Sequence, residues 1–253
     1  MRDFDILCLA VICGLALTAC GKAKACATVT FDGLPFTVCE ATAPSEIKFF
    51  LKNQTGEIYG SFDAVKATLK ASDQRLVFAM NGGMYHESRN PVGLYVENGV
   101  QASKLNRNQG PGNFHLLPNG VFWIGQDSSG VMTADDFANT FAEDFGANGV
   151  KYATQSGPML VIETKLHPAF REDSKSLRIR NGVGQTSQGQ IFFVKSELPV
   201  NFHTFARLFR DELKTPNALF LDGTVSKLYS DDLGRNDTGQ DMGPIIGVIE
   251  AVP

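Results

Sequence analysis

The sequence has little of what a nucleic-acid-binding or membrane-spanning protein requires. Its 253 residues carry 23 Lys and Arg against 27 Asp and Glu, a formal net charge of −4. There is thus no excess of positive charge to hold a polyphosphate backbone. The apolar run at residues 6–19 is too short to span a bilayer. We therefore expect no nucleic-acid partner and no transmembrane helix.

Motifs for metals, nucleotides and serine nucleophiles are also missing. The four histidines are scattered, without H-x-x-x-H or H-E-x-x-H spacing, so we expect no metal centre. No G-x-x-x-x-G-K-[ST] stretch is present, and Ser156 lacks the preceding Gly-x of a nucleophile elbow. The sequence therefore predicts neither a cofactor nor a serine-hydrolase triad.

The N-terminus has the pattern of a targeting segment. Arg2 precedes the apolar run 6–19, whose length suits a signal peptide. Leu17-Thr18-Ala19-Cys20 resembles a bacterial lipobox, in which the cysteine is lipidated and becomes the first residue of the mature chain. Ala23-Lys24-Ala25 offers an ordinary A-x-A cleavage site instead. Both interpretations predict export: a lipid-anchored protein facing the periplasm, or a soluble periplasmic or secreted one.

The five cysteines agree with export. Three lie in the targeting segment or at its cleavage point, which leaves Cys26 and Cys39 as a pair. Residues 27–31 and 34–38 flank Asp32-Gly33, a two-residue hairpin turn that would set the two cysteines opposite each other. We therefore predict a structural disulfide between them, formed in an oxidising compartment.

Strand signals dominate the remainder of the chain. Helices are expected to begin at Ser61, at Thr133 and near Asn201, each followed by apolar residues at helical spacing. Short strands are predicted at 46–52, 75–80, 91–97, 100–105, 113–117, 120–125, 150–155, 159–162, 191–194 and 218–221. Because no βαβ alternation repeats, the predicted fold class is α+β, a mixed and largely antiparallel sheet with a few packed helices.

One of these strands ends in a carboxylate. Residues 218–221 are continuously apolar, which is typical of a buried strand, and Asp222-Gly223 follows at once. A charge at the tip of a buried strand must be stabilised. Asp222 is therefore a candidate functional residue, although Asp-Gly is also a good turn signal between Leu221 and Val225.

Three further stretches combine polar side chains with glycine. Asn81-Gly82-Gly83 follows a strand, 106–113 is a polar loop that begins and ends with asparagine, and 178–186 contains Arg180-Asn181-Gly182. Glycine lets a ligand approach the main chain closely, and arginine matches phosphate oxygens with a planar fork. The simpler interpretations are a turn, a solvated loop and a salt-bridging arginine.

Several stretches together resemble one family. The similar segments are 78–84, 91–97, 155–160, 178–184, 205–209 and 218–223. In this order they look like the phosphodiester glycosidase domain (DUF2233), which also occurs in the mammalian enzyme that uncovers mannose 6-phosphate on lysosomal enzymes. The resemblance covers residues 49–253, the glycosidase-like domain. The targeting pattern and the cysteines assign 1–19 to a signal peptide of lipoprotein type and 20–48 to an anchor and hairpin region. Thr224 stands where the mammalian type has a second glycine.

The resemblance implies cleavage of a sugar-1-phosphodiester at the anomeric carbon, which releases the sugar and a phosphomonoester. The residues that we expect to act in catalysis are Asp222, Asn81, Arg180 and, as a second carboxylate, Glu87. Those expected to contact substrate are Gly82, Gly83, His86, Asn106, Asn113, Ser156, Gly157, Asn181, Gly223 and Thr224. The expected partner is a sugar-1-phosphodiester or an envelope glycan, and the membrane is reached through the lipid anchor alone.

Two other functions remain open on the sequence. The same amide-rich loops suit a non-catalytic envelope module that binds glycan or sugar phosphate without turnover. A structural lipoprotein would do neither. Turnover of sugar-1-phosphodiesters separates the enzyme from both alternatives.

Overall fold

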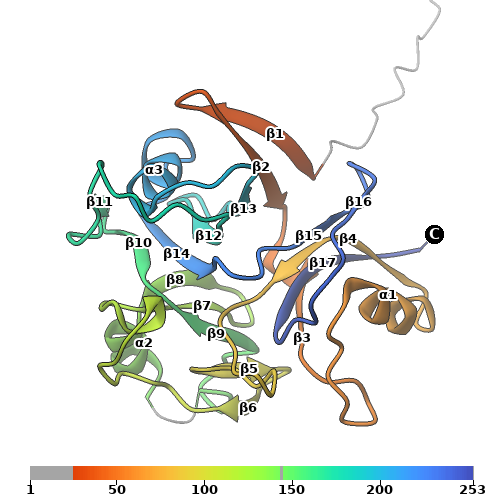
Figure 1. Ribbon diagram of the computed structural model, residues 1–253. Coiled ribbons are helices and arrows are strands. Elements are labelled where there is room, and N and C mark those ends of the chain that lie inside the picture. The colour runs from red at the N-terminus through yellow and green to blue at the C-terminus, as the bar shows by residue number, and fades with distance from the viewer. Residues whose placement is uncertain (1–24, 143–144, 253) are drawn as a thin grey trace, which may run out of the picture.

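The protein is built from three β-sheets with a helix packed on each (Figure 1). The computed structural model describes residues 25–142 and 145–252. The first sheet has the order β1 (Cys26–Phe31), β2 (Leu34–Ala41), β13 (Ile191–Ser196), β12 (Asn181–Gln185), β14 (Asn217–Asp222), β10 (Met159–Ile162) and β11 (Lys165–Leu166). The second has β16 (Arg235–Asn236), β15 (Leu228–Ser230), β4 (Gln74–Asn81), β17 (Ile245–Ala251) and β3 (Ile47–Phe50). The third has β6 (Val100–Ser103), β5 (Tyr95–Glu97), β9 (Tyr152–Ser156), β7 (Gly120–Ile124) and β8 (Ser129–Thr133).

Neighbouring strands within these sheets run antiparallel. This agrees with the predicted α+β class in part. The strands form three antiparallel sheets where one mixed sheet was predicted, and the sheets contribute far more than the short helices. None of the helices in the described ranges has the length and apolar character needed to cross a bilayer.

The predicted hairpin at the start of the described chain is confirmed. β1 pairs with β2 around Asp32 and Gly33, in a register that sets Cys26 opposite Cys39, and the two cysteines form a disulfide. Their separation of 13 residues closes a short loop. In the chain-entropy model such a link stabilises the fold by about 3 kcal/mol.

The three helices are capped as their sequences predict. They are α1 (Phe62–Lys70), α2 (Ala134–Phe141) and α3 (Phe202–Arg207), the last continuing through a π-helical turn at Leu208–Glu212. Ser61 accepts a hydrogen bond from the Ala64 N–H, Thr133 from Asp136, and Asn201 from Thr204. Each cap satisfies an N–H group that the helix itself leaves without a partner.

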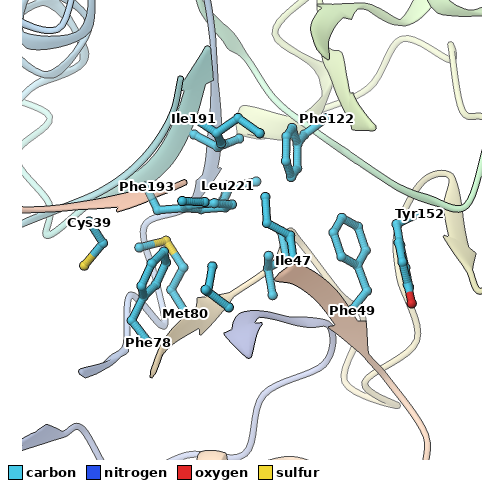
Figure 2. Close-up of a cluster of buried hydrophobic side chains, with 14 of the residues drawn as sticks. Cys39, Ile47, Phe49, Phe78, Met80, Phe122, Tyr152, Ile191, Phe193 and Leu221 are labelled. Carbon is cyan, nitrogen blue, oxygen red and sulfur yellow. The ribbon is translucent and has the colours of Figure 1, made fainter. Parts of the chain in front are cut away.

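The main hydrophobic core lies where the three sheets meet (Figure 2). Phe193 and Leu221 come from the first sheet, Phe49 and Met80 from the second, and Phe122 from the third. Leu221 is fully buried there and directly precedes Asp222. Core packing therefore fixes the position of the Asp222 backbone.

Residues 113–117, predicted as a strand, form a 3-10 turn at Asn113–His115. Gly112 before this turn has a φ of 86°, so the chain bends as it enters the segment. Pro118 beyond it has no N–H to give to a strand ladder. For these two reasons the segment forms a turn where its side-chain pattern predicted a strand.

The turn after Asp222 does not close a hairpin. β14 belongs to the first sheet and β15 to the second, so residues 223–227 carry the chain from one sheet to the other. The polar segment 178–186 is also more regular than its composition suggests, because β12 runs through it between β13 and β14.

Candidate functional site

A cavity of about 380 Å³ opens where β14 of the first sheet ends beside the loop that follows β4 of the second. Residues from four separate segments line it. They are Met84, Tyr85, His86, Glu87, Arg89, Val92, Asn113, Asp222, Thr224, Val225 and Gln240. The structure therefore brings five of the predicted site residues to one cavity: Asp222, Glu87, His86, Asn113 and Thr224.

The Asp222 carboxylate is held by main-chain N–H groups of the turn that follows it. Oδ1 accepts from Gly223 at 2.6 Å and from Thr224 at 2.9 Å, and Oδ2 accepts from Val225 at 3.2 Å. The residue is only 7% exposed, yet it lines the cavity. Asp222 thus sits in a turn, as the Asp-Gly signal predicts, and at the candidate site as well.

A buried pair of amides supports this carboxylate. Asn81 Nδ2 lies 3.4 Å from Asp222 Oδ2 and 3.3 Å from Asn181 Oδ1. Asn181 Nδ2 in turn donates to the Asn81 main-chain oxygen at 2.9 Å. Asn81 Oδ1 accepts from the Lys227 N–H at 3.0 Å. Both asparagines are fully buried. They join the ends of β4 and β12 and present a donor to Asp222.

Burial shifts the acid–base properties of the site. Loss of solvent raises the pKa of Asp222 above its usual value, although its three main-chain N–H bonds act in the opposite direction. Burial also raises the pKa of Tyr85 to about 12, with a further contribution from the Asp222 charge. A carboxyl group with a raised pKa in a cavity is typical of an acid–base or nucleophilic site.

The loop after β4 forms one wall of the cavity. Tyr85 and Pro91 form an isolated β-bridge, and within it the His86 N–H donates to the Asn90 oxygen at 2.9 Å. The Tyr85 hydroxyl donates to the main-chain oxygen of Asp241 at 3.2 Å. This bonding gives the loop a defined shape.

Gly82 and Gly83 allow close packing, the first against β17 of the same sheet and the second against β9 of the third sheet. A Cβ on Gly82 would lie 2.6 Å from the Ile246 side chain. Gly83 has a φ of +135°, and a Cβ there would lie 2.8 Å from Thr154 Oγ1, which itself donates to the Gly82 oxygen. The two glycines are buried and lie outside the cavity lining.

Other predicted residues build the frame around the cavity. The Ser156 hydroxyl is fully buried and donates to the Leu221 oxygen at 2.8 Å, which ties β9 to β14. A Cβ on Gly157 would lie 2.7 Å from the Asn119 side chain. Asn106 bonds with the buried Gln155 amide through its main-chain N–H and oxygen. Gly223 contributes its N–H to Asp222.

Arg180 is not among the residues that line the cavity. Its guanidinium carbon lies 3.7 Å from the centre of the Phe202 ring, and the side chain is 1% exposed. Nε donates to the Val200 oxygen and Nη2 to the Ser176 oxygen. Burial lowers the pKa of Arg180 to about 10, so the group is charged at neutral pH. Arg180 directly precedes β12. Its side chain packs on Phe202, whereas that of Asn181, the first residue of the strand, bonds with Asn81.

Sequence reasoning missed half of the cavity lining. The residues not foreseen are Met84, Tyr85, Arg89, Val92, Val225 and Gln240. Most are close in sequence to a residue that was foreseen, and the Asn90-Pro91 turn signal marks the end of the loop that carries Arg89. Across residues 25–142 and 145–252, no group of His, Cys, Asp and Glu side chains has the arrangement of a metal site.

Comparison with known proteins identifies the family. The profile of the phosphodiester glycosidase family matches residues 74–248. An uncharacterised Escherichia coli K12 protein, YigE, is 37% identical over 183 residues, which is 72% of this chain and 69% of YigE.

Two solved structures share the fold. The zebrafish N-acetylglucosamine-1-phosphodiester α-N-acetylglucosaminidase catalytic domain, auto-inhibited by its pro-peptide, superposes with a TM-score of 0.60 at 14% identity, covering 88% of this chain and 81% of that one. A hypothetical protein from Synechocystis gives 0.55 at 13% identity, covering 88% and 61%. The family resemblance read from the sequence motifs is therefore confirmed, and the chain belongs to the phosphodiester glycosidase family.

Proposed function

We propose that the protein hydrolyses a sugar-1-phosphodiester at the anomeric carbon and releases the sugar and a phosphomonoester. The observation that carries the proposal is the Asp222 carboxylate, which is largely buried, is bound by three main-chain N–H groups, and forms part of the cavity lining. The family of the chain supports the same chemistry. Asp222 acts as nucleophile, as base or as stabiliser of the oxocarbenium-like transition state.

The proposed leaving group explains why a single well-placed carboxylate is enough. Ordinary glycosidases need a second carboxyl group to protonate a poor alkoxide leaving group. A phosphomonoester leaves as a stable anion near neutral pH, so donors that bind its oxygens replace most of the general acid's work. Glu87 is exposed at the cavity edge, where it is available as a supplementary acid or base.

A panel assay tests this function against glycan binding without turnover. The purified protein is incubated with sugar-1-phosphodiesters that differ in sugar and anomeric configuration, and reducing sugar is measured. Release of sugar and phosphomonoester from at least one member is expected. Binding of intact ligand with no release from any member would favour the non-catalytic envelope module instead.

The pH dependence of hydrolysis should report the raised pKa of Asp222. If the ionised carboxylate is the reactive form, kcat/KM falls as pH drops through that pKa, which lies above the usual aspartate value of about 3.9. The measurement is kcat/KM between pH 3 and 7, a range in which a phosphodiester stays ionised. The same acid limb is expected in Glu87→Gln, and its disappearance in that variant would assign the titration to Glu87.

We also propose that the protein is exported and held at the membrane through Cys20. That residue lies outside the described ranges, and the Cys26–Cys39 disulfide supports an oxidising compartment. Cys20→Ser is expected to move the protein from the membrane fraction to the soluble fraction, whereas Cys8→Ser should leave it membrane-bound. Membrane retention of Cys20→Ser would argue against the lipid anchor.

A further inference from the structure

We infer that Arg89 is the residue that binds the phosphate group of the substrate, a role that the sequence motifs suggested for Arg180. The inference rests on the proposed function and adds the position of the phosphate. It places the phosphate at the wall of the cavity formed by the loop after β4, within reach of a sugar held over Asp222.

Arg89 is unlike the other arginines of the described chain. Six of them form ion pairs: Arg75, Arg107, Arg171, Arg207, Arg210 and Arg235. Arg178 and Arg180 donate to main-chain oxygens. Within residues 25–142 and 145–252, Arg89 alone has a guanidinium with neither an ion pair nor a hydrogen bond. Its only partner there is the ring of Tyr85, 5.5 Å from the guanidinium carbon.

The backbone holds Arg89 in a conformation that L-residues avoid. Its φ is +67°, in the left-handed region, and its N–H donates to the His86 oxygen at 2.8 Å. Gly243 lets this loop pack closely, since a Cβ there would lie 2.6 Å from the Arg89 oxygen. Strain of this kind persists where the surrounding structure enforces it, often at binding sites. Here it presents a half-buried arginine to the cavity.

The charges around the cavity suit a phosphate bound beside Asp222. Asp222, Tyr85 and Arg89 all line the cavity, and the guanidinium carbon of Arg89 lies 5.5 Å from the centre of the Tyr85 ring. Lys227 is also close to Arg89, but its ammonium group donates to the Gln240 main-chain oxygen. Arg89 lines the cavity and Lys227 does not, and the planar fork of Arg89 can bind two phosphate oxygens at once.

Arg89→Gln tests the inference through substrates that differ in the leaving group. With a sugar-1-phosphodiester, kcat/KM is expected to fall about 10- to 100-fold, the loss expected for charge-assisted hydrogen bonds. With a neutral aryl glycoside of the same sugar, the change should stay below about threefold, because no phosphate is present for Arg89 to bind. Inorganic phosphate should inhibit the wild type competitively and should inhibit Arg89→Gln at least tenfold more weakly. Arg89→Lys should recover part of both effects.

Two control variants separate binding from folding. Arg75→Gln removes the same charge near the opposite end of β4, about 20 Å from Asn81, and should behave as the wild type in both assays. Arg89→Gly relieves the left-handed strain and should raise the melting temperature by a few degrees while weakening phosphate inhibition as Arg89→Gln does. If inorganic phosphate inhibited Arg89→Gln and Arg89→Gly as strongly as the wild type, the inference would be overturned and the proposed function would remain intact.

A protein without turnover gives a different result. If the wild type hydrolyses no phosphodiester, the proposed function fails, and thermal stabilisation by inorganic phosphate then tests the site alone. Stabilisation of the wild type but not of Arg89→Gln would retain Arg89 as an anion-binding residue. Equal behaviour of the two proteins would overturn that role as well.

Discussion

Asp222→Asn is expected to lower kcat/KM for the phosphodiester by a factor of about 10³ or more. The substitution keeps the size of the side chain but removes the negative charge. An amide cannot act as nucleophile or base, and it stabilises developing positive charge at the anomeric carbon far less than a carboxylate does. Steady-state rates of the wild type and the variant on one phosphodiester provide the measurement.

The stability of this variant reflects two opposing effects. Each carboxylate oxygen accepts two N–H groups, so the oxygen replaced by NH₂ leaves two donors without an acceptor, at a cost of about 1–3 kcal/mol. Removal of a buried charge offsets part of that loss. We therefore expect the variant to remain folded, with unfolding free energy within about 2 kcal/mol of the wild type at pH 7.

The pH dependence of that difference follows from the raised pKa of Asp222. Because the pKa of Asp222 is higher in the folded state than in the unfolded state, protonation of this carboxyl group favours folding. This contribution is fully present below the unfolded-state pKa of about 3.9, and it is lost as pH rises through the folded-state pKa. The asparagine does not titrate. The wild type should therefore exceed the variant in stability by more at pH 4 than at pH 7.

Asp241→Asn is the matched control for the activity measurement. Asp241 is an exposed carboxylate that influences Tyr85 electrostatically but does not line the cavity. Its rate should stay close to that of the wild type. Full activity in Asp222→Asn, or an equal loss in the two variants, would remove Asp222 from the chemistry.

Local sequence information predicted the elements whose geometry depends on neighbouring residues. The Asp32-Gly33 turn fixes the register of β1 and β2, which places Cys26 opposite Cys39. Each helix N-cap likewise depends only on an N–H group three residues further along the chain, so the sequence predicts it. The position of Asp222 at a strand end followed from four apolar residues and a turn signal.

Placement of the other site residues depends on contacts between distant strands. Asn81, Asn181 and Asp222 meet because β4 of the second sheet ends beside β12 and β14 of the first. Sequence alone does not tell which of two adjacent polar residues lies beside the Asp222 carboxylate. Asn181 bonds with Asn81 next to Asp222, whereas Arg180 packs on Phe202. The role proposed for Arg89 rests on a guanidinium that has no ion pair or hydrogen bond within the described residues, which only the assembled chain reveals.

Asn81→Asp should have the largest effect on stability among changes that conserve size at the site. The Nδ2 group that donates to Asn181 and Asp222 becomes an oxygen, and a second carboxylate is placed 3.4 Å from the first. Two like charges in a buried site cannot both ionise without a large cost. We expect the unfolding free energy to fall by about 3–5 kcal/mol at pH 7, as for other uncompensated buried charges. Most of the loss should be recovered near pH 4, where the pair binds a proton.

A double-mutant cycle with Asp222→Asn isolates the contact between residues 81 and 222. If repulsion between the two carboxylates causes the loss, removing the charge of Asp222 should reduce the cost of Asn81→Asp by at least about 1 kcal/mol. Asn119→Asp provides the comparison, because Asn119 is also a buried amide whose Nδ2 donates to protein oxygens but not to Asp222. The loss of unfolding free energy caused by Asn119→Asp should be the same in the wild type and in Asp222→Asn. The acid limb of kcat/KM should move to higher pH in Asn81→Asp but not in Asn119→Asp. Equal costs of Asn81→Asp in the two backgrounds would mean that Asn81 stabilises the sheets without acting on the carboxylate.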